Sequence, residues 1–124
     1  MALVVGVAAT PAWAASITSS GPLTQIGTTT DLNCSVNHAG DAAGEWFGDT
    51  ACGTLVATGG VLYGPADIPA GSSAAPRTPW TPVSQTTGGD GSVGNPFTIT
   101  TDVTGGPLAV RQIDTYVIGQ ESYR

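Results

Sequence analysis

Lysine is missing from this chain, and its only arginines are Arg77, Arg111 and Arg124. Nine acidic residues leave the 124-residue chain with a formal net charge of −6 at pH 7. Proteins that bind nucleic acid neutralise phosphates with Lys and Arg, and anionic membrane surfaces attract the same side chains. The sequence therefore excludes nucleic acid as a partner and disfavours binding to anionic membrane surfaces.

Strong helix formers are scarce as well. Charged residues make up only 10% of the chain, whereas Thr, Val and 18 glycines are abundant. Thr and Val favour strands, while Lys, Glu and Gln favour helices. Disorder is the competing interpretation, but Trp46, Trp80, Phe97 and several alternating apolar runs can bury a core. We therefore expect an all-β fold with an antiparallel, sandwich-like arrangement.

The longest apolar run, ALVVGVAA at residues 2–9, is followed by Ala12, Trp13 and Ala14. It is shorter than the roughly 20 apolar residues that span a bilayer. Signal peptidase cleaves after a segment with small residues at the first and third positions before the cleaved bond, and Ala14 and Ala12 occupy these positions if cleavage follows Ala14. We therefore interpret residues 1–14 as a signal peptide, with cleavage after Ala15 as the alternative site.

Two further points concern this N-terminal segment. A signal peptide normally opens with a basic residue, so we expect the natural start of the chain to lie upstream of Met1. The alternative is that residues 3–9 form a buried first strand. The remaining residues, 15–124, are predicted to form one β-rich extracellular domain.

Alternating apolar and polar residues predict short strands separated by Gly and Pro. A glycine pair, Gly59-Gly60, predicts a hairpin turn between two of these strands. The glycine-rich GDGSVG at residues 89–94 matches a dinucleotide-binding fingerprint only in letters, because a strand and not a helix follows it. The expected extended segments are residues 22–26, 31–37, 53–58, 61–64, 80–86, 97–103 and 108–124.

The last three segments are predicted to form an antiparallel meander over residues 80–118. The run at 108–124 is about twice the usual strand length, so we expect a bulge near Arg111 and Gln112. In a regular strand Leu108 and Val110 would face one side of the sheet and Ile113 the other, and a bulge would bring all three to the same side. Because the chain stops just after this long strand, we expect the fold to continue beyond Arg124.

Cys34 and Cys52 are the only cysteines, and they enclose the polar residues 35–51. In an exported protein two cysteines favour a disulfide that closes this loop. A redox pair or a metal thiolate site is the alternative. Zinc is disfavoured, because a structural site takes four ligands and the chain adds only one histidine.

The loop between the cysteines holds the candidate binding residues. Oxygen ligands for calcium could come from Asp41, Glu45 and Asp49, although their spacing does not fit an EF-hand. Trp46 beside Glu45 could offer a stacking surface for a sugar. We interpret the loop mainly as a structural excursion held by a disulfide, with weak calcium or sugar binding as the alternative. His38 as a general base and Glu45 with Asp49 as a glycosidase pair are less favoured, and no catalytic residue is assigned.

Three stretches carry a family resemblance: DLNCSVNHAGDAAGEWFGDTACGTLVATGGVLYGPADIPAG, TPWTPVSQ and DTYVIGQESYR. Together they resemble the start of an uncharacterised exported β-rich module in large secreted proteins of actinobacteria. The resemblance covers about residues 20–124. It implies a secreted β-rich domain that is followed by further β-rich sequence, and it carries no activity, catalytic residue or binding residue.

Two classes of function remain open at this point. The first is a non-catalytic module, secreted or at the cell surface, for adhesion or glycan binding. The alternative is the N-terminal part of a secreted carbohydrate-active β-sandwich enzyme whose catalytic residues lie downstream. The expected partners are a cell-wall or extracellular glycan, or the rest of the same chain. No cofactor is expected apart from the weak calcium alternative.

Overall fold

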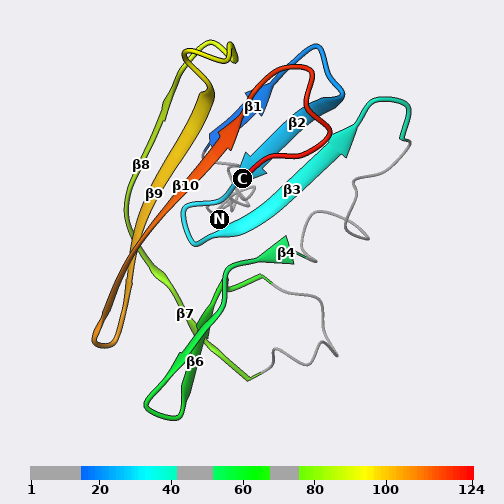
Figure 1. Cartoon of the computed structure of the whole chain (residues 1–124). Coiled ribbons are helices and arrows are strands. Elements are labelled where there is room, and N and C mark those ends of the chain that lie inside the picture. Colours follow the sequence, from blue (N-terminus) through cyan, green and yellow to red (C-terminus); the bar gives the residue numbers. More distant parts are fainter. Residues whose placement is uncertain (1–14, 42–51, 68–75) are drawn as a thin grey trace, which may run out of the picture.

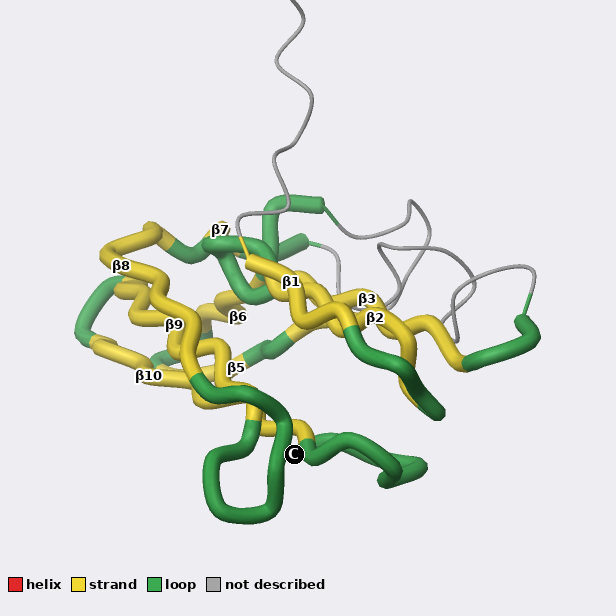
Figure 2. The backbone as a smooth tube through the Cα atoms, turned by 90° about the horizontal axis from the view of Figure 1, so that it is seen from above, coloured by secondary structure: helices red, strands yellow, loops and turns green. Residues whose placement is uncertain are grey.

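The computed structural model describes residues 15–41, 52–67 and 76–124, and these residues form strands and loops without a helix (Figures 1 and 2). The all-β prediction is therefore confirmed. The strands are β1 Ala15–Thr18, β2 Leu23–Thr28, β3 Asn33–His38, β4 Cys52–Gly53, β5 Val56–Thr58, β6 Val61–Gly64, β7 Thr78–Pro79, β8 Thr81–Gly88, β9 Phe97–Gly105 and β10 Leu108–Tyr116.

Two antiparallel sheets form a sandwich-like arrangement (Figure 1). One sheet has the order β1-β2-β3-β4, and the other has the order β10-β9-β8. A small third sheet pairs β5 with β6 antiparallel and β6 with β7 parallel, and it lies at one end of the sandwich. The meander predicted for residues 80–118 is thus confirmed as β8, β9 and β10.

Two hairpin turns show why the sequence reverses where it does. Gly59 and Gly60 join β5 to β6 with φ of 57° and 78°, and glycine adopts this left-handed region without steric cost. Gly106 opens the two-residue turn between β9 and β10 with φ of 53°. The glycine-rich residues 89–94 likewise lie in a loop between β8 and β9, with φ of 82° at Gly89.

The bulge predicted within residues 108–124 is wrong. β10 pairs with β9 in one continuous register from Leu108 opposite Gly105 to Tyr116 opposite Phe97. The inward side chains are therefore the even-numbered ones along the whole strand, with Asp114 buried and Ile113 exposed. Irregular pairing occurs instead in β8, between Pro82 and Ser84, and in β2, between Leu23 and Gln25.

The interior of the sandwich contains two apolar clusters. The first cluster consists of Ala15, Ile17, Leu23, Ile26, Val36, Ile99 and Tyr116. The second, toward the small third sheet, consists of Leu32, Tyr63, Trp80 and Val103. In the second cluster the Tyr63 and Trp80 rings stack with centroids 5.5 Å apart, and Trp80 Nε1 donates a hydrogen bond to Thr54 O.

A layer of buried polar side chains lies between the two clusters. On β9 the buried Thr101 separates Ile99 from Val103, and on β10 Asp114 is only 5% exposed. Thr28 Oγ1 donates to Asp114 Oδ2 at 2.8 Å, which joins the two sheets. Gln112 Nε2 donates to both Asp114 oxygens at 2.9 and 3.1 Å. Buried polar groups that are paired in this way fix how the two sheets align.

The segment after β10 folds back across the sandwich. Arg124 exchanges both backbone hydrogen bonds with Thr115 at the outer edge of β10, at 2.7 and 3.0 Å. Tyr123 packs against the first apolar cluster. The backbone amides of Ile118 and Gly119 donate to the loops before β9 and β2. These contacts hold the last eight residues in a defined path, shown in red in Figure 1.

Candidate functional site

The disulfide predicted between Cys34 and Cys52 is present. The two residues are direct partners in the β3–β4 ladder, and their Cα atoms are 5.1 Å apart. This separation lies in the range that disulfides require. The bond therefore joins the two ends of the polar loop, as the sequence analysis predicts.

Most of the loop's candidate ligands lie outside the described residues, namely Glu45, Trp46 and Asp49. Asp41 is described, and its carboxylate lies 3.8 Å from His38 Nδ1. Within the described ranges, no group of three or more His, Cys, Asp or Glu side chains is placed to hold a metal ion. The calcium and sugar alternatives for this loop stay predictions.

His38 connects the loop to the C-terminal segment. Its Nε2 lies 3.0 Å from Glu121 Oε2, and the side chain of His38 is partly exposed while that of Glu121 is largely exposed. The hydrogen bond to Glu121 raises the pKa of His38 above its usual value. The histidine thus acts as a surface contact between β3 and the last residues of the chain.

A second candidate site lies on the outer face of the β8–β9–β10 sheet. Here a hollow of about 500 Å³ is lined by Val83 of β8, Asp102 and Thr104 of β9, and Ala109 and Arg111 of β10. The β9–β10 register places Asp102 directly opposite Arg111. Small-molecule sites typically have volumes of about 300–1,000 Å³, so this hollow is large enough for a ligand.

Two charged residues of this hollow form a row across the three strands together with the neighbouring Ser84. Arg111 Nε donates to Asp102 Oδ1 at 2.8 Å, and Arg111 Nη2 donates to Asp102 Oδ2 at 3.1 Å. Ser84 Oγ on β8 donates to Asp102 Oδ2 at 2.9 Å. The hydrogen bond from Arg111 lowers the pKa of Asp102 below its usual value, so the carboxylate stays ionised at neutral pH.

This arrangement leaves donors free for a ligand. Asp102 uses only the Nε–H and one N–H of Nη2 of Arg111, so the remaining guanidinium hydrogens have no hydrogen-bond partner among the described residues. The Arg111 side chain is 66% exposed. Beside it, the aliphatic Val83 is 62% exposed. The hollow thus combines a fixed polar row with an apolar neighbour.

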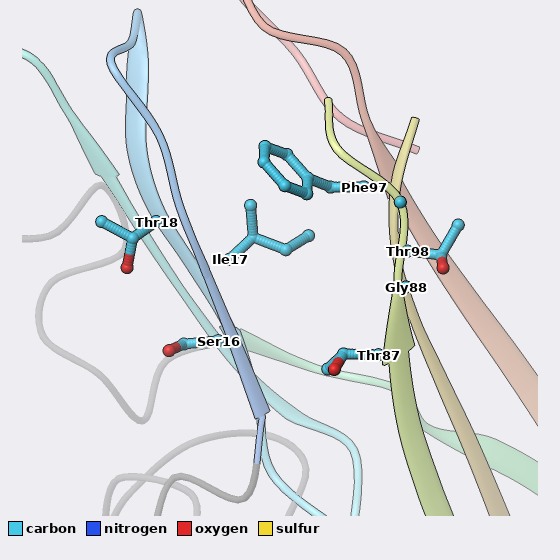
Figure 3. Close-up of a pocket in the computed structure, with 8 residues that line it drawn as sticks. Ser16, Ile17, Thr18, Thr87, Gly88, Phe97 and Thr98 are labelled. Carbon is cyan, nitrogen blue, oxygen red and sulfur yellow. The ribbon is translucent and has the colours of Figure 1, made fainter. Parts of the chain in front are cut away.

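A second hollow lies between the edges of the two sheets (Figure 3). Ile17 of β1 and Phe97 of β9 point toward each other across it, and Thr87 of β8 lines it. Its volume is about 200 Å³. Because this is below the usual size of a ligand site, we consider it a gap between the edges of the two sheets.

The sequence analysis missed the Ser84–Asp102–Arg111 row. A turn signal could have found it, because Gly-Gly-Pro at residues 105–107 predicts a two-residue hairpin loop. If Gly105 pairs with Leu108, each step away from the turn pairs the next residue on either strand, and the third step places Asp102 opposite Arg111.

Comparison with known proteins gives no match. No family model matches the chain, and the searches of curated proteins and of solved structures find no similar protein. In the described residues no helix is long and apolar enough to cross a membrane.

Proposed function

We propose that this protein is an exported, non-catalytic β-module that binds an extracellular glycan at the hollow of the β8–β9–β10 sheet. The observation that carries the proposal is the Ser84–Asp102–Arg111 row beside the exposed Val83. The Cys34–Cys52 bond supports the location, because disulfides persist mainly in oxidising compartments.

The chemistry of a sugar fits this surface in two ways. A pyranose ring offers neighbouring hydroxyl groups, and each can both donate and accept a hydrogen bond. Arg111 supplies free donors and Asp102 supplies acceptor oxygens, at a spacing fixed by their ion pair. The ring also offers C–H faces, which can pack against the aliphatic Val83 and Ala109. The site bears one positive and one negative group, so it suits an uncharged sugar.

The test is calorimetric titration with soluble neutral cell-wall and extracellular oligosaccharides. For a sugar that binds, Arg111→Ala is expected to weaken the affinity at least about tenfold, which equals roughly 1.4 kcal/mol. Exposed ion pairs contribute only about 0–1 kcal/mol to stability, so the variant should still fold. Circular dichroism and the urea midpoint check this.

The matched control is Arg124→Ala, because it removes the same side chain from a position outside the hollow. Arg124 is held through its backbone, so the control keeps the contact with Thr115. Binding that is unchanged in Arg111→Ala, or a complete absence of binding across the panel, would reject the proposal.

Export makes a separate prediction about the N-terminus. Mass spectrometry of the protein recovered from the culture medium should show a chain that begins at Ala15 or Ser16. Cleavage after Ala14 keeps β1 whole, whereas cleavage after Ala15 removes one residue that is 7% exposed and paired with Thr28. Recovery of a folded, exported chain that still carries Met1 would contradict the interpretation of residues 1–14 as a signal peptide.

A further inference from the structure

One edge of the β8–β9–β10 sheet carries backbone groups that can pair with another strand. β8 ends the strand order of this sheet. In an antiparallel sheet the N–H and C=O groups of successive residues point alternately to the two neighbouring strands. The pairing of β10 with Arg124 shows which residues direct their backbone groups outward at the β10 edge, and the strand registers extend this to the β8 edge.

The alternation can be followed across the sheet. The backbone N–H and C=O groups of Thr115 point outward and bond to Arg124, so they do not bond to its partner on β9, Thr98. The N–H and C=O groups of Thr98 therefore point the other way, toward β8. The register is continuous from Thr98 opposite Gly88 to Asp102 opposite Ser84. Every second residue of β9 in this range therefore bonds to β8.

On β8 this leaves two residues with outward backbone groups. Gly88, Thr86 and Ser84 bond to β9, so the N–H and C=O groups of Gln85 and Thr87 face away from the sheet. Among the described residues, neither has a backbone partner on that side. An edge with free groups of this kind is a template for strand pairing.

We propose that the partner at this edge is a second copy of the chain, which pairs β8 antiparallel with its own β8 about a two-fold axis at Thr86. The reason for preferring a second copy is the symmetry of this edge, because Gln85 and Thr87 lie equally far from Thr86 and can pair with each other across a two-fold axis. The chain carries a net charge of −6, and two copies repel each other through most of their surface. β8 has no charged residue from Thr81 to Gly88, so its edge can meet itself without like charges in contact.

The register follows from the same strand. Pro82 lacks an N–H, and the pairing is irregular between Pro82 and Ser84, so this end cannot extend a ladder. The regular part runs from Ser84 to Gly88, and its centre is Thr86. A two-fold axis there pairs Gln85 with Thr87 of the second copy, so the free backbone groups of both copies bond to each other. Thr86 then faces Thr86 of the second copy, and Thr–Thr pairs across strands are favourable.

The contact is small. Stable interfaces bury about 1,200–2,000 Å² in total, and five paired residues at one edge bury less. The dimer is therefore expected to be weak, with a dissociation constant of roughly 0.1–1 mM. Salt should strengthen it, because screening reduces the repulsion between the two negative chains.

Analytical ultracentrifugation of the full chain from about 10 μM to 1 mM, at low and high salt, tests the proposal. The expected result is a monomer–dimer equilibrium that shifts toward the dimer as salt rises. Thr86→Lys should abolish it, because two like charges then lie directly opposite each other. Thr87→Pro should abolish it as well, because it removes an outward N–H without touching the β8–β9 ladder.

The matched control is Thr100→Lys. Thr100 is the partner of Thr86 on β9 and lies on the same face, so the variant adds the same charge one strand further in. In the dimer its two copies would be three strand spacings apart, about 14 Å, which exceeds the Debye length of about 8 Å at physiological salt. This variant should dimerise like the wild type.

Three results would overturn the proposal. The first is a monomer over the whole concentration range at both salt levels. The second is a dimer that Thr86→Lys leaves intact. The third is slow hydrogen exchange at the Gln85 and Thr87 amides that does not depend on concentration, since it would show that a segment of the same chain already covers the edge. None of these readouts involves a glycan, so they are independent of the proposed binding site.

Discussion

Replacing both Cys34 and Cys52 with alanine is expected to lower the free energy of unfolding by about 3 kcal/mol. The two residues are 18 positions apart, and a bond across a loop of this size restricts the unfolded chain by about that amount. Cys34 is also 9% exposed, so its truncation removes some buried apolar surface. Urea unfolding of the wild type and the double variant measures the difference.

A reduced wild-type sample is the control for this experiment. Reduction breaks the bond but keeps both side chains, so it separates the effect of the cross-link from the loss of packing. In the oxidised protein, thiol titration under denaturant should find no free thiol. A urea midpoint that is the same with and without the bond would contradict the prediction, because it would show that the cross-link does not stabilise the folded state relative to the unfolded chain.

The second large effect concerns Asp114, whose carboxyl lies in the polar layer between the apolar clusters. Burial raises the pKa of Asp114, although hydrogen bonds from Gln112 and Thr28 oppose part of this shift. The folded state therefore keeps a proton on Asp114 at pH values at which the unfolded chain has lost it. Between the unfolded value near 3.8 and the raised folded value, stability is lost as pH rises, and above that window the loss is constant.

Asp114→Asn is expected to remove this contribution. Thr28 can still donate to the asparagine oxygen, and rotation of the Gln112 amide supplies an acceptor for the new N–H₂ group. The variant's free energy of unfolding, relative to the wild type, should therefore rise through this window and stay level above it. Chemical unfolding at closely spaced pH values from 3 to 8 measures the difference curve.

The exposed Asp41 provides the control for the pH experiment. Asp41→Asn removes an exposed carboxylate outside the polar layer, so its difference curve should lack the rise that is expected for Asp114→Asn in the acidic range. The charge of Asp41 contributes to the raised pKa of His38, so a change in the control curve near neutral pH belongs to that pair. Asp90 and Asp102 have lowered pKa values and act in the opposite direction, but they are shared by all three proteins and cancel in the difference. A flat curve for Asp114→Asn would mean that Asp114 is ionised in the folded protein with no energetic penalty.

The strands that alternate cleanly were predicted correctly from the sequence. In β9 the inward Ile99 and Val103 and the outward Thr98 and Thr100 follow the pattern expected of a half-buried strand. The turn at Gly59 was also correct, because its chemistry is local. Local signals of this kind need no knowledge of the rest of the chain.

The parity of β10 could not be predicted in the same way. Hydrophobicity places Ile113 inside and Asp114 outside, and the structure shows the reverse. The two-residue turn at Gly106 fixes the register of β10 against β9, and a shift by one residue would turn every side chain over. Asp114 is tolerated inside because Thr28, distant in sequence, donates to it. That partner becomes visible only when the two sheets are brought together.

The candidate sites likewise differ in how far local sequence predicts them. The disulfide was expected because the chain has only two cysteines and a predicted export signal, which are features of composition and local sequence. Within the Ser84–Asp102–Arg111 row, the turn at residues 105–107 indicates the Asp102–Arg111 pair, whereas Ser84 joins it only through the register of β8 against β9.

The closing of the sandwich also sets the order in which the chain can fold. Leu23 N donates to Tyr116 Oη across 93 positions, and Thr28 reaches Asp114 across 86. Synthesis delivers β1, β2 and β3 first, so the apolar face that carries Ile17, Ile26 and Val36 has no opposite sheet until β10 has been made. Contacts this distant make folding slow, in the range of milliseconds to seconds that is typical of all-β domains. The half-built sheet thus exposes apolar surface that favours aggregation, and its lifetime depends on how soon the last strand arrives.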